Sequence, residues 1–444
     1  MPYFRRSLEN ELKSFIESNE PHKHVLLVEG ARQVGKTTLV ERMLENLDWP
    51  VIAVNLEREA VMRSRIDTCA EFSEFQDLMV DQYGFDPGQR TVVFIDECQE
   101  STRLGGFVRF MKELWAHATV ILTGSTLSRL FRNTTRYPVG RVRRLQVTPF
   151  SFGEFLEAGG ESAIAALLNG DLAAISAARH EHLLERLDAY LTTGGLPAAV
   201  LVGLRGGDLR SCHQNIRADY EQDFIRLFGE EKMPIVDGCF RGVANFVGGA
   251  SKHASIIPSP TNREHHIISQ VFARLESWML VLKSSQSGPS PERSHRYLPK
   301  RYLFDTGLLK HIREAALPSL AVVHSIDSET RKVLGGIVEN QVAIEIRKQF
   351  GELTGWKRSP SGGEIDFLIK RQGAMIPVEC KAAVRIKGTH IKGIKQYLEQ
   401  YHQETGAIVS LAPFSITEVG EKTKVVNIPL YAAEHIGRIL QGLG

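Results

Sequence analysis

The segment that most restricts how this chain can fold is a glycine-rich loop near its N-terminus. Residues 30–37 read GARQVGKT, which fits the pattern GxxxxGK[ST]. An apolar run from His24 to Glu29 precedes the loop, and apolar residues at helical spacing follow Thr37. A buried strand, a glycine loop and a helix are the context that this pattern requires. The chain is therefore expected to contain a parallel sheet that ends in a phosphate-binding loop.

The residue types in this loop predict binding of ATP together with Mg²⁺. Glycine lets successive backbone N–H groups face a phosphate, and the N-terminus of the following helix adds positive potential. Lys36 is expected to reach the β- and γ-phosphates, and the hydroxyl of Thr37 is expected to hold Mg²⁺. The predicted nucleotide-binding residues are Gly30, Arg32, Gln33, Val34, Gly35, Lys36, Thr37 and Thr38.

Two adjacent acids follow a second apolar run, TVVFIDE at residues 91–97. Side chains at the carboxyl ends of parallel strands lie at the edge of the sheet where ligands bind. Asp96 is expected to hold Mg²⁺ through water, and Glu97 is expected to orient or deprotonate the attacking water. The alternative is a solvated strand end without a chemical role.

Two further apolar runs, at 51–56 and 118–122, predict more strands. Alternating strands and helices favour a parallel sheet that is covered on both faces. The second run leads into Thr123-Gly-Ser-Thr, and Ser125 is predicted to sense the γ-phosphate.

Residues 129–145 hold six arginines and no acid. They can supply an arginine finger or sensor for the transferred phosphoryl group, a surface facing nucleic acid, or a solvated basic loop. Arg141 is the predicted finger or sensor. Action on a neighbouring copy would require a homo-oligomer, whereas action within its own chain would not.

The middle of the chain is predicted to be helical. Residues 151–190 are rich in Ala, Leu and Glu and favour a helical lid over the nucleotide. A capping signal at 261–264 begins a helix that is predicted to reach residue 282, after another helical stretch at 236–248. A Ser/Pro/Gly-rich loop follows between two predicted strands, an order typical of a winged helix-turn-helix. The polar face of the helix at 262–282 is predicted to contact DNA. The alternative is that this region is a spacer between the neighbouring domains.

A β-hairpin is predicted in the C-terminal third, with a two-residue turn at 372–373. Alternation of apolar residues determines its register. The expected apolar pairs are Phe367 with Val378, Ile369 with Ile376, and Ile365 with Cys380.

The opposite face of this hairpin pairs Asp366 with Glu379. Directly opposed carboxylates repel each other unless a cation lies between them or one of them is protonated. We therefore expect Mg²⁺ between them, with Lys381 orienting a water or stabilising charge that develops at a phosphate. The alternative is an ordinary hairpin in which Lys381 bridges Glu364 and Asp366 is solvated.

Composition adds few restrictions. The chain has 444 residues and a net charge of +2, so nucleic-acid binding has to come from local clusters. Five isolated cysteines without a CxxC spacing argue for a reducing compartment and against zinc or disulfides. No signal peptide or membrane-spanning run is predicted, so the expected location is the cytoplasm, with no membrane partner.

Several segments, taken in order, resemble one family. They are GARQVGKTTL, VVFIDECQE, ILTGST, VGRVRRLQVTPFSFGEFL, TTGGLPAAV and KRYLFDTGLL. The chain is similar in these segments to AAA-type bacterial and archaeal ATPases with a C-terminal domain of unknown function (number 4143). The resemblance implies an ATP-binding core, a linker region of winged-helix type and a C-terminal fold similar to restriction endonucleases.

The acids of the hairpin also resemble the D…ExK signature of the PD-(D/E)xK nuclease fold. In GGIVENQVAIEI, Glu339 stands where that fold often contributes a third acid. The predicted metal ligands of this region are therefore Glu339, Asp366 and Glu379. Downstream, residues 381–395 carry five Lys or Arg and no acid, which suits a polyanionic substrate.

Together these patterns predict an α/β protein with four parts: a P-loop ATPase core, a helical lid, a winged-helix-like region and a nuclease-like α/β domain. The predicted ranges are 1–150, 151–205, 206–310 and 311–444. Two functions stay open. One is an ATP-hydrolysing protein that processes nucleic acid, DNA favoured, and cuts it with Mg²⁺. The other is an ATP-dependent switch or scaffold whose silent nuclease-like domain binds a protein or nucleic acid.

Overall fold

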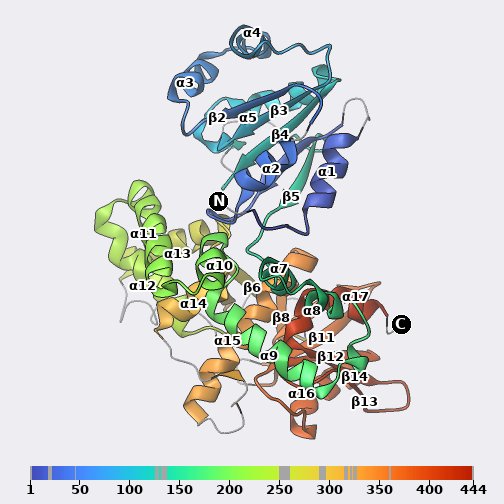
Figure 1. Cartoon of the computed structure of the whole chain (residues 1–444). Helices are drawn as coiled ribbons and strands as arrows, with labels where there is room; N and C mark the ends of the chain where they lie inside the picture. Colours follow the sequence, from blue (N-terminus) through green and yellow to red (C-terminus); the bar gives the residue numbers. More distant parts are fainter. Residues whose placement is uncertain are drawn as a thin grey trace. The chain divides into compact units, whose positions relative to one another are not determined.

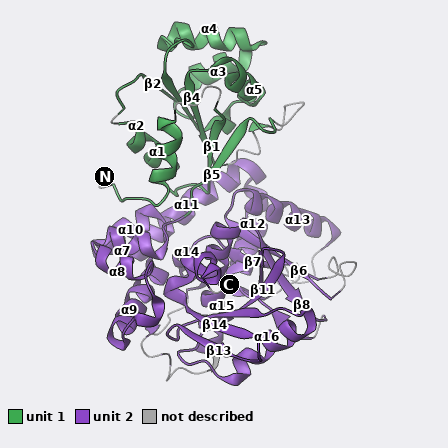
Figure 2. Cartoon of the chain, turned by 90° about the vertical axis from the view of Figure 1, so that its right-hand side faces the viewer, with its two compact units in different colours: residues 1–148 green, residues 149–444 purple. Residues whose placement is uncertain are grey.

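The computed structural model forms two compact units, residues 1–148 (unit 1) and 149–444 (unit 2) (Figures 1 and 2). The predicted boundaries at 205/206 and 310/311 both fall within unit 2, and the four-part division stays a prediction. The residues that the structure describes are 3–18, 23–45, 47–125, 130–131, 138–249, 261–289, 297–314, 319–320, 323, 328–359 and 362–442.

Unit 1 is built on a five-stranded sheet of order β2-β3-β4-β1-β5, in which all neighbouring strands are parallel. Its strands are β1 (Val25–Glu29), β2 (Val51–Asn55), β3 (Thr91–Asp96), β4 (Ala118–Gly124) and β5 (Val142–Gln146). Every residue of β3 and β4 is buried, as expected for central strands of a parallel sheet. The predicted α/β class and parallel sheet are confirmed.

Helices lie around this sheet (Figure 1). They are α1 (Glu9–Glu17), α2 (Lys36–Leu44), α3 (Ala60–Thr68), α4 (Phe72–Tyr83), a 3₁₀ turn (Cys98–Glu100) and α5 (Leu104–Leu114). An aromatic cluster joins α4 to α5, with the rings of Phe75 and Phe107 stacked at 5.1 Å between centroids. Trp115 packs against Phe75 at 5.7 Å, and all three side chains are buried. This core holds the helices against the sheet that carries the P-loop.

Unit 2 begins with helices and continues into two mixed sheets. Its helices are α7 (Phe152–Ala158), α8 (Ser162–Leu167), α9 (Ala177–Thr193), α10 (Pro197–Leu204), α11 (Leu209–Phe228), α12 (Met233–Asn245), α13 (Asn262–Ser277), α14 (Thr306–Arg313), α15 (Ser328–Phe350), α16 (Gly388–Tyr401) and α17 (Ile436–Gln441). Short 3₁₀ turns lie at Leu172–Ala174, Glu230–Lys232 and Leu430–His435. The predicted lid helices α7 to α9 thus form part of unit 2, and their role as a lid stays a prediction.

The first sheet of unit 2 has the order β7-β6-β8-β9, and the second has the order β10-β11-β12-β14-β13. The strands are β6 (Val281–Ser287), β7 (Lys300–Leu303), β8 (Leu353–Lys357), β9 (Glu364–Ile365), β10 (Phe367–Arg371), β11 (Ala374–Lys381), β12 (Thr405–Ser410), β13 (Ser415–Glu418) and β14 (Lys424–Pro429). β6 and β7 form the antiparallel pair expected of a wing, but β6 also pairs with β8. One sheet therefore joins the two regions that were predicted as separate domains.

Helix α15 is the central helix of unit 2. Residues 337–346 are buried almost throughout, and the polar side chains of Asn340, Gln341 and Glu345 are buried together with the apolar ones. Its buried Asn340 accepts the N–H of Leu303 at 2.8 Å and donates to the carbonyl of Leu303 at 3.0 Å. This amide attaches β7 to α15 and brings Lys300 close to Glu339.

Two of the sequence segments without an assigned role, TTGGLPAAV and KRYLFDTGLL, meet in unit 2. The buried carboxylate of Asp305 accepts the N–H of Gly195 at 2.7 Å and the N–H of Leu308 at 2.8 Å, the second contact capping α14. A Cβ on Gly194 would lie 2.3 Å from Asp305 Oδ1. The two segments therefore have a packing role that needs a glycine at this position.

Candidate functional site

The P-loop of unit 1 connects β1 to α2. Gln33 and Gly35 have φ values of 65° and 89°, so the backbone turns through the left-handed region before the helix begins at Lys36. A Cβ on Gly30 would lie 2.1 Å from the carbonyl oxygen of Val147. Glycine is thus required at the start of the loop, where the backbone passes close to another segment.

Lys36 is buried within the loop, with 5% of its surface exposed. Its ammonium donates to the carbonyl oxygens of Gly30 at 3.0 Å and Ala31 at 2.8 Å. Burial lowers the pKa of Lys36 to about 8, although the nearby charges of Glu97 and Asp96 oppose this effect. The lysine is therefore held in position by neutral carbonyl groups rather than by an ion pair.

Asp96 is the centre of the polar contacts around the P-loop. Its Oδ2 accepts the hydroxyl of Thr37 at 2.9 Å and the side-chain amide of Asn55 at 2.8 Å. Its Oδ1 accepts the hydroxyl of Thr123 and the backbone N–H of Glu97, the latter at 3.0 Å. The structure thus brings together Thr37 and Asp96, the two predicted Mg²⁺ ligands of unit 1.

Sequence reasoning missed Asn55 and Thr123. Asn55 ends β2 and Thr123 lies near the end of β4, the two neighbours of β3 in the sheet. Polar residues at adjacent carboxyl ends of parallel strands were the signal that could have identified them. Ser125, chosen instead as the sensor, lies two residues beyond Thr123, and its role stays a prediction.

Glu97 follows Asp96 in a left-handed backbone conformation, with φ of 51°. Burial raises the pKa of its carboxyl above the ordinary value, and the amide of Gln99, which donates to Oε2, opposes that shift. A carboxylate with a raised pKa beside the P-loop matches the needs of a general base.

Arg141 lies at the other end of the sheet from the P-loop. Its carbonyl oxygen accepts the N–H of Val25 at 2.9 Å, at the start of β1, whereas the loop follows the end of that strand. A five-residue strand is about 13 to 17 Å long. The guanidinium instead pairs with Glu113, at 2.9 Å from Nε to Oε1. These contacts place Arg141 away from the P-loop of its own chain, and its role as a finger or sensor stays a prediction.

The other described arginines of the basic run also pair with acids of unit 1. Arg143 contacts Glu11 at 2.7 Å, and Arg144 contacts Glu29 at 3.2 Å. These contacts agree with a solvated basic segment. The remaining arginines, Arg129, Arg132 and Arg136, lie outside the described residues.

The predicted hairpin register is confirmed for β10 and β11. Phe367 pairs with Val378, and the turn residues Gln372 and Gly373 both have positive φ values, as a two-residue turn requires. The predicted pair of Ile365 with Cys380 is wrong, because Ile365 belongs to β9 and pairs with Trp356 in the other sheet.

Asp366 lies between β9 and β10 and contacts a buried lysine. The ammonium of Lys300 lies 3.1 Å from Asp366 Oδ1 and 2.9 Å from Glu339 Oε1, and it also pairs with Glu364. The hydroxyl of Tyr302 donates to Glu339 Oε1 at 2.7 Å. We call Lys300, Glu339, Glu364 and Asp366 the Lys300 cluster. Sequence reasoning missed Lys300, which lies in the KRYLFDTGLL segment.

Glu379 has a different cation. Lys381 donates to Glu379 Oε2 at 2.7 Å, whereas Glu364 pairs with Lys300 and Lys357, so the expected bridge from Lys381 to Glu364 is not the pairing observed. Burial and the charge of Asp366 raise the pKa of Glu379 to about 8.

These contacts differ from the predicted Mg²⁺ site of the hairpin. Within the described ranges, no three or more His, Cys, Asp or Glu residues form a group that could hold a metal ion. Glu339 and Asp366 share the ammonium of Lys300, and Glu379 pairs with Lys381. The structure therefore does not support Glu339, Asp366 and Glu379 as a shared set of metal ligands, because ammonium groups occupy the positions between and beside the carboxylates.

The helix predicted for residues 262–282 is present as α13, but it ends at Ser277, because the chain enters strand β6 at Val281. DNA contact by this helix stays a prediction. The capping box formed by Thr261 and Glu264 begins the helix, and Arg263, His266 and Gln270 are exposed on it. A second exposed basic segment precedes and enters α16. Its exposed cations are Arg385, Lys387, Lys392 and Lys395. The winged-helix assignment itself stays a prediction.

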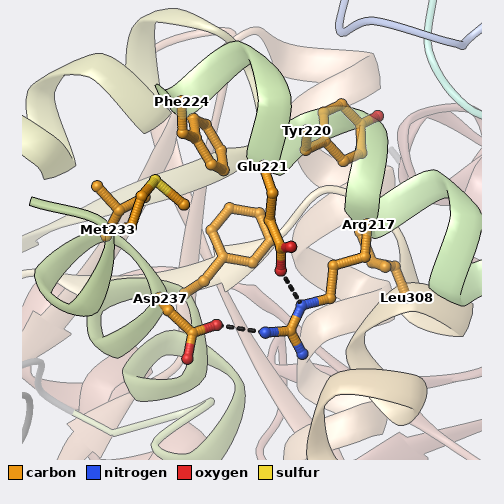
Figure 3. Close-up of a pocket in the computed structure, with 9 residues that line it drawn as sticks. Arg217, Tyr220, Glu221, Phe224, Met233, Asp237 and Leu308 are labelled. Carbon is orange, nitrogen blue, oxygen red and sulfur yellow. Dashed lines mark hydrogen bonds and ion pairs between the residues drawn. The ribbon is translucent and has the colours of Figure 1, made fainter. Parts of the chain in front are cut away.

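A pocket between α11, α12 and α14 combines apolar walls with one partly exposed ion network (Figure 3). The guanidinium of Arg217 pairs with Glu221, at 2.9 Å from Nε to Oε1, and with Asp237. Tyr220 and Phe224 line the wall beside it. Because two acids balance Arg217, the pocket gives no reason to expect an anionic ligand.

The sequence comparisons agree with this arrangement. Residues 22–156 match the AAA domain. Residues 184–318 match a domain of unknown function (DUF8612), and residues 334–431 match a domain of unknown function (DUF4143). An AAA domain supports ATP binding and hydrolysis in general, which agrees with the P-loop geometry. No curated protein matches this chain.

Among solved structures, the chain is similar to the Orc1 protein of Aeropyrum pernix in complex with DNA. The TM-score is 0.32 and the identity 15%, over 70% of this chain and 94% of that chain. For Cdc6p from Pyrobaculum aerophilum the TM-score is 0.28 and the identity 11%, over 64% and 88%. Neither score is high enough to support an argument about function. Across the described part of the chain, no helix has the length and apolar character needed to cross a membrane.

Proposed function

We propose that the AAA domain binds and hydrolyses ATP with Mg²⁺, and that this reaction controls how unit 2 engages nucleic acid, with DNA favoured. The observation that carries the first part is the 2.9 Å contact of the Thr37 hydroxyl with Asp96 beside the buried ammonium of Lys36. A hydroxyl and a carboxylate at the start of a helix that follows a glycine loop suit a phosphate with its cation.

The side chains at this position fit Mg²⁺, because hydroxyl and carboxylate oxygens are the ligands that it prefers. Thr37 would hold the ion directly and Asp96 would hold it through water. When bound, Mg²⁺ neutralises charge on the β- and γ-phosphates. Lys36 would bind the same phosphates, and Glu97 would orient the attacking water and accept its proton. The raised pKa of Glu97 supports that last role.

Nucleic-acid binding is proposed for two exposed surfaces of unit 2, one on α13 and one at the start of α16. The first carries Arg263, and the second carries Arg385, Lys387, Lys392 and Lys395. The cations of the second surface have no acid between them in the sequence, which suits a phosphate backbone. The nuclease-like region would bind without cutting, because Asp366 and Glu379 already have ammonium partners. This inference favours the switch over the nuclease.

The test measures ATP turnover by the full chain with no DNA, with single-stranded DNA and with duplex DNA. We expect DNA to stimulate turnover in the wild type and not in Arg385→Glu/Lys387→Glu/Lys392→Glu. The matched control is Lys370→Glu/Lys422→Glu, which reverses exposed cations elsewhere in the same unit. In a plot of the logarithm of DNA affinity against the logarithm of salt concentration, the steepness of the slope is expected to fall by about one for each cation that no longer neutralises a phosphate.

Three results would reject the proposal. Absence of ATP turnover under all conditions would reject the ATPase. ATP turnover that is unchanged by DNA but is stimulated by a protein fraction would indicate a protein partner instead of nucleic acid. Plasmid cutting in Mg²⁺ or Mn²⁺ that disappears in Asp366→Asn would show that the nuclease-like region is an active nuclease and not a silent binding domain.

A further inference from the structure

The cluster around Lys300 contains a cation of its own. Lys300 is 1% exposed, and its ammonium contacts the carboxylates of Glu339, Glu364 and Asp366. An ammonium has three N–H donors, and these three acceptors use all of them. Glu339 comes from α15, whereas Glu364 and Asp366 lie two residues apart at β9 and just before β10. Lys300 of β7 therefore joins two other segments that are distant from it in the sequence.

The carboxylate oxygens are also held by other groups. Asp366 Oδ2 accepts the N–H of Cys380 at 2.9 Å, and Glu364 Oε2 pairs with Lys357 at 2.9 Å. On the far side of Glu339, a Cβ on Gly248 would lie 2.5 Å from Oε2, so the backbone passes close to that oxygen. A divalent ion would have to compete for oxygens that already bind an ammonium, a hydroxyl or a backbone N–H.

The charge of the lysine is maintained by the same contacts. Burial by itself would lower the pKa of Lys300, but the charges of Asp366, Glu339 and Glu364 outweigh burial and raise it far above its ordinary value. A divalent cation placed among these carboxylates would lie beside a permanent positive charge, and the two would repel strongly in a medium of low dielectric constant.

We propose that Lys300 is the built-in cation of this cluster and that it excludes a divalent metal ion from Glu339, Glu364 and Asp366. The inference goes beyond the proposed function and does not depend on it, because it concerns metal binding in unit 2 rather than turnover of ATP. The proposal also gives a role to the lysine that is packed among acids resembling those of a nuclease site.

The experiment counts Mn²⁺ bound to the full chain by electron paramagnetic resonance, without nucleotide. All variants carry Asp96→Asn, which removes the acid expected to bind metal in the AAA domain. We expect no Mn²⁺ at the Lys300 cluster when Lys300 is present. We expect about one additional ion per chain in Lys300→Met, because oxygen ligands without an ammonium are available to a hard cation. The additional signal should disappear when Asp366→Asn is added.

The matched control is Lys357→Met, which removes an ammonium that pairs with Glu364 and leaves Lys300 in place. It is expected to bind no additional Mn²⁺. Mn²⁺ bound at the cluster in the presence of Lys300, and absent in Asp366→Asn, would overturn the proposal. So would a folded Lys300→Met variant that gains no ion.

If Lys300→Met does not fold, Lys300→Met/Glu364→Gln reduces the unbalanced charge and takes its place. The anomalous signal of Mn²⁺ in crystals of the unchanged chain gives a second, independent answer. A peak between Glu339 and Asp366 would overturn the proposal, and the Lys300 ammonium at that position without a peak would support it. ATP turnover could fail or succeed in the same preparation without changing either result.

Discussion

Two buried lysines, one in each unit, differ in what surrounds their ammonium groups. Lys36 in the AAA domain is 5% exposed and donates to neutral carbonyls, whereas Lys300 in unit 2 is 1% exposed and contacts three carboxylates. Burial disfavours the charge in both places. It lowers the pKa of Lys36 to about 8, but the acids around Lys300 raise the pKa there.

The difference teaches how a buried ammonium relates to function. An ammonium without a built-in counter-charge is suited to receive an anion such as a phosphate, which then supplies the missing charge. An ammonium whose anions belong to the protein is suited to hold segments together. The first lysine is thus expected to matter for ligand binding, and the second is expected to matter for stability.

The largest expected effect is on the stability of unit 2 in Lys300→Met. Removing one partner from a buried ion network leaves the other charges uncompensated, which costs about 3 to 5 kcal/mol. We expect the free energy of unfolding, measured by urea denaturation, to fall by that amount. Lys357→Met should cost about 1 kcal/mol or less, since Lys357 contacts the cluster only through Glu364. Equal losses in the two variants would contradict the comparison.

In the AAA domain the corresponding change, Lys36→Met, should act on the ligand instead. We expect ATP affinity, measured by titration calorimetry, to fall by about tenfold to a hundredfold, because a hydrogen bond to a charged group contributes about 1.5 to 3 kcal/mol. Stability should be unchanged or higher, because a buried charge without an ion partner is removed. Lys23→Met is the control, since its ammonium also donates to backbone carbonyls, those of Phe15 and Ile16, away from the loop. A large loss of stability in Lys36→Met would contradict the view that Lys36 serves ligand binding and Lys300 serves stability.

ATP affinity should also depend on pH. Binding of phosphate favours the charged form of Lys36, whose pKa in the free protein is about 8. Affinity is therefore expected to be constant below this pH and to fall by about tenfold per pH unit above it. Calorimetry between pH 7 and pH 9.5 would measure this change. Constant ATP affinity over that range would mean that the pKa of Lys36 is not lowered by burial, contrary to this prediction.

A second pH effect is expected in unit 2 from Glu379. Its pKa is raised to about 8 in the folded chain, so the folded state holds a proton that the unfolded state loses near pH 4.5. The resulting stabilisation is complete below about pH 4.5 and is lost as the pH rises to about 8, by at most about 1.4 kcal/mol per pH unit. Denaturation of the wild type and of Glu379→Gln at pH 5 to 8.5 should show a steeper slope in the wild type. Part of the slope should remain in both, because the pKa of Glu339 is also raised, to about 7. An identical slope in both would assign the effect to other groups.

The smallest effect is expected for Arg141→Ala. Its solvent-accessible ion pair with Glu113 contributes little to stability, because water and salt screen the two charges. At protein concentrations where the chain is monomeric, ATP turnover should change by no more than about twofold. A loss of turnover that appears only at high protein concentration would identify Arg141 as a finger acting on a neighbouring copy. A large loss at every concentration would contradict its position at the far end of the sheet.

Much of the AAA domain was predictable because its signals are local. The loop from Gly30 to Thr37 requires glycine backbone conformations, and the strand ending in Asp96 shows itself by a continuous apolar run. Asn55 and Thr123 were missed because each is an ordinary polar residue until the sheet order places its strand beside β3. The distance of Arg141 from the P-loop of its own chain was not predictable for a related reason, since the sequence does not show at which end of a parallel strand a neighbouring segment begins.

In unit 2 the sequence alone determined the hairpin register, since alternation and a two-residue turn leave one pairing that keeps Phe367 and Val378 on the same face. It did not determine what faces Asp366. Only the tertiary structure, with Asn340 holding β7 against α15, brings Lys300 to that carboxylate. The physical reason is that local patterns encode backbone conformation and burial, whereas the partner of a buried charge is selected by packing between segments far apart in the chain.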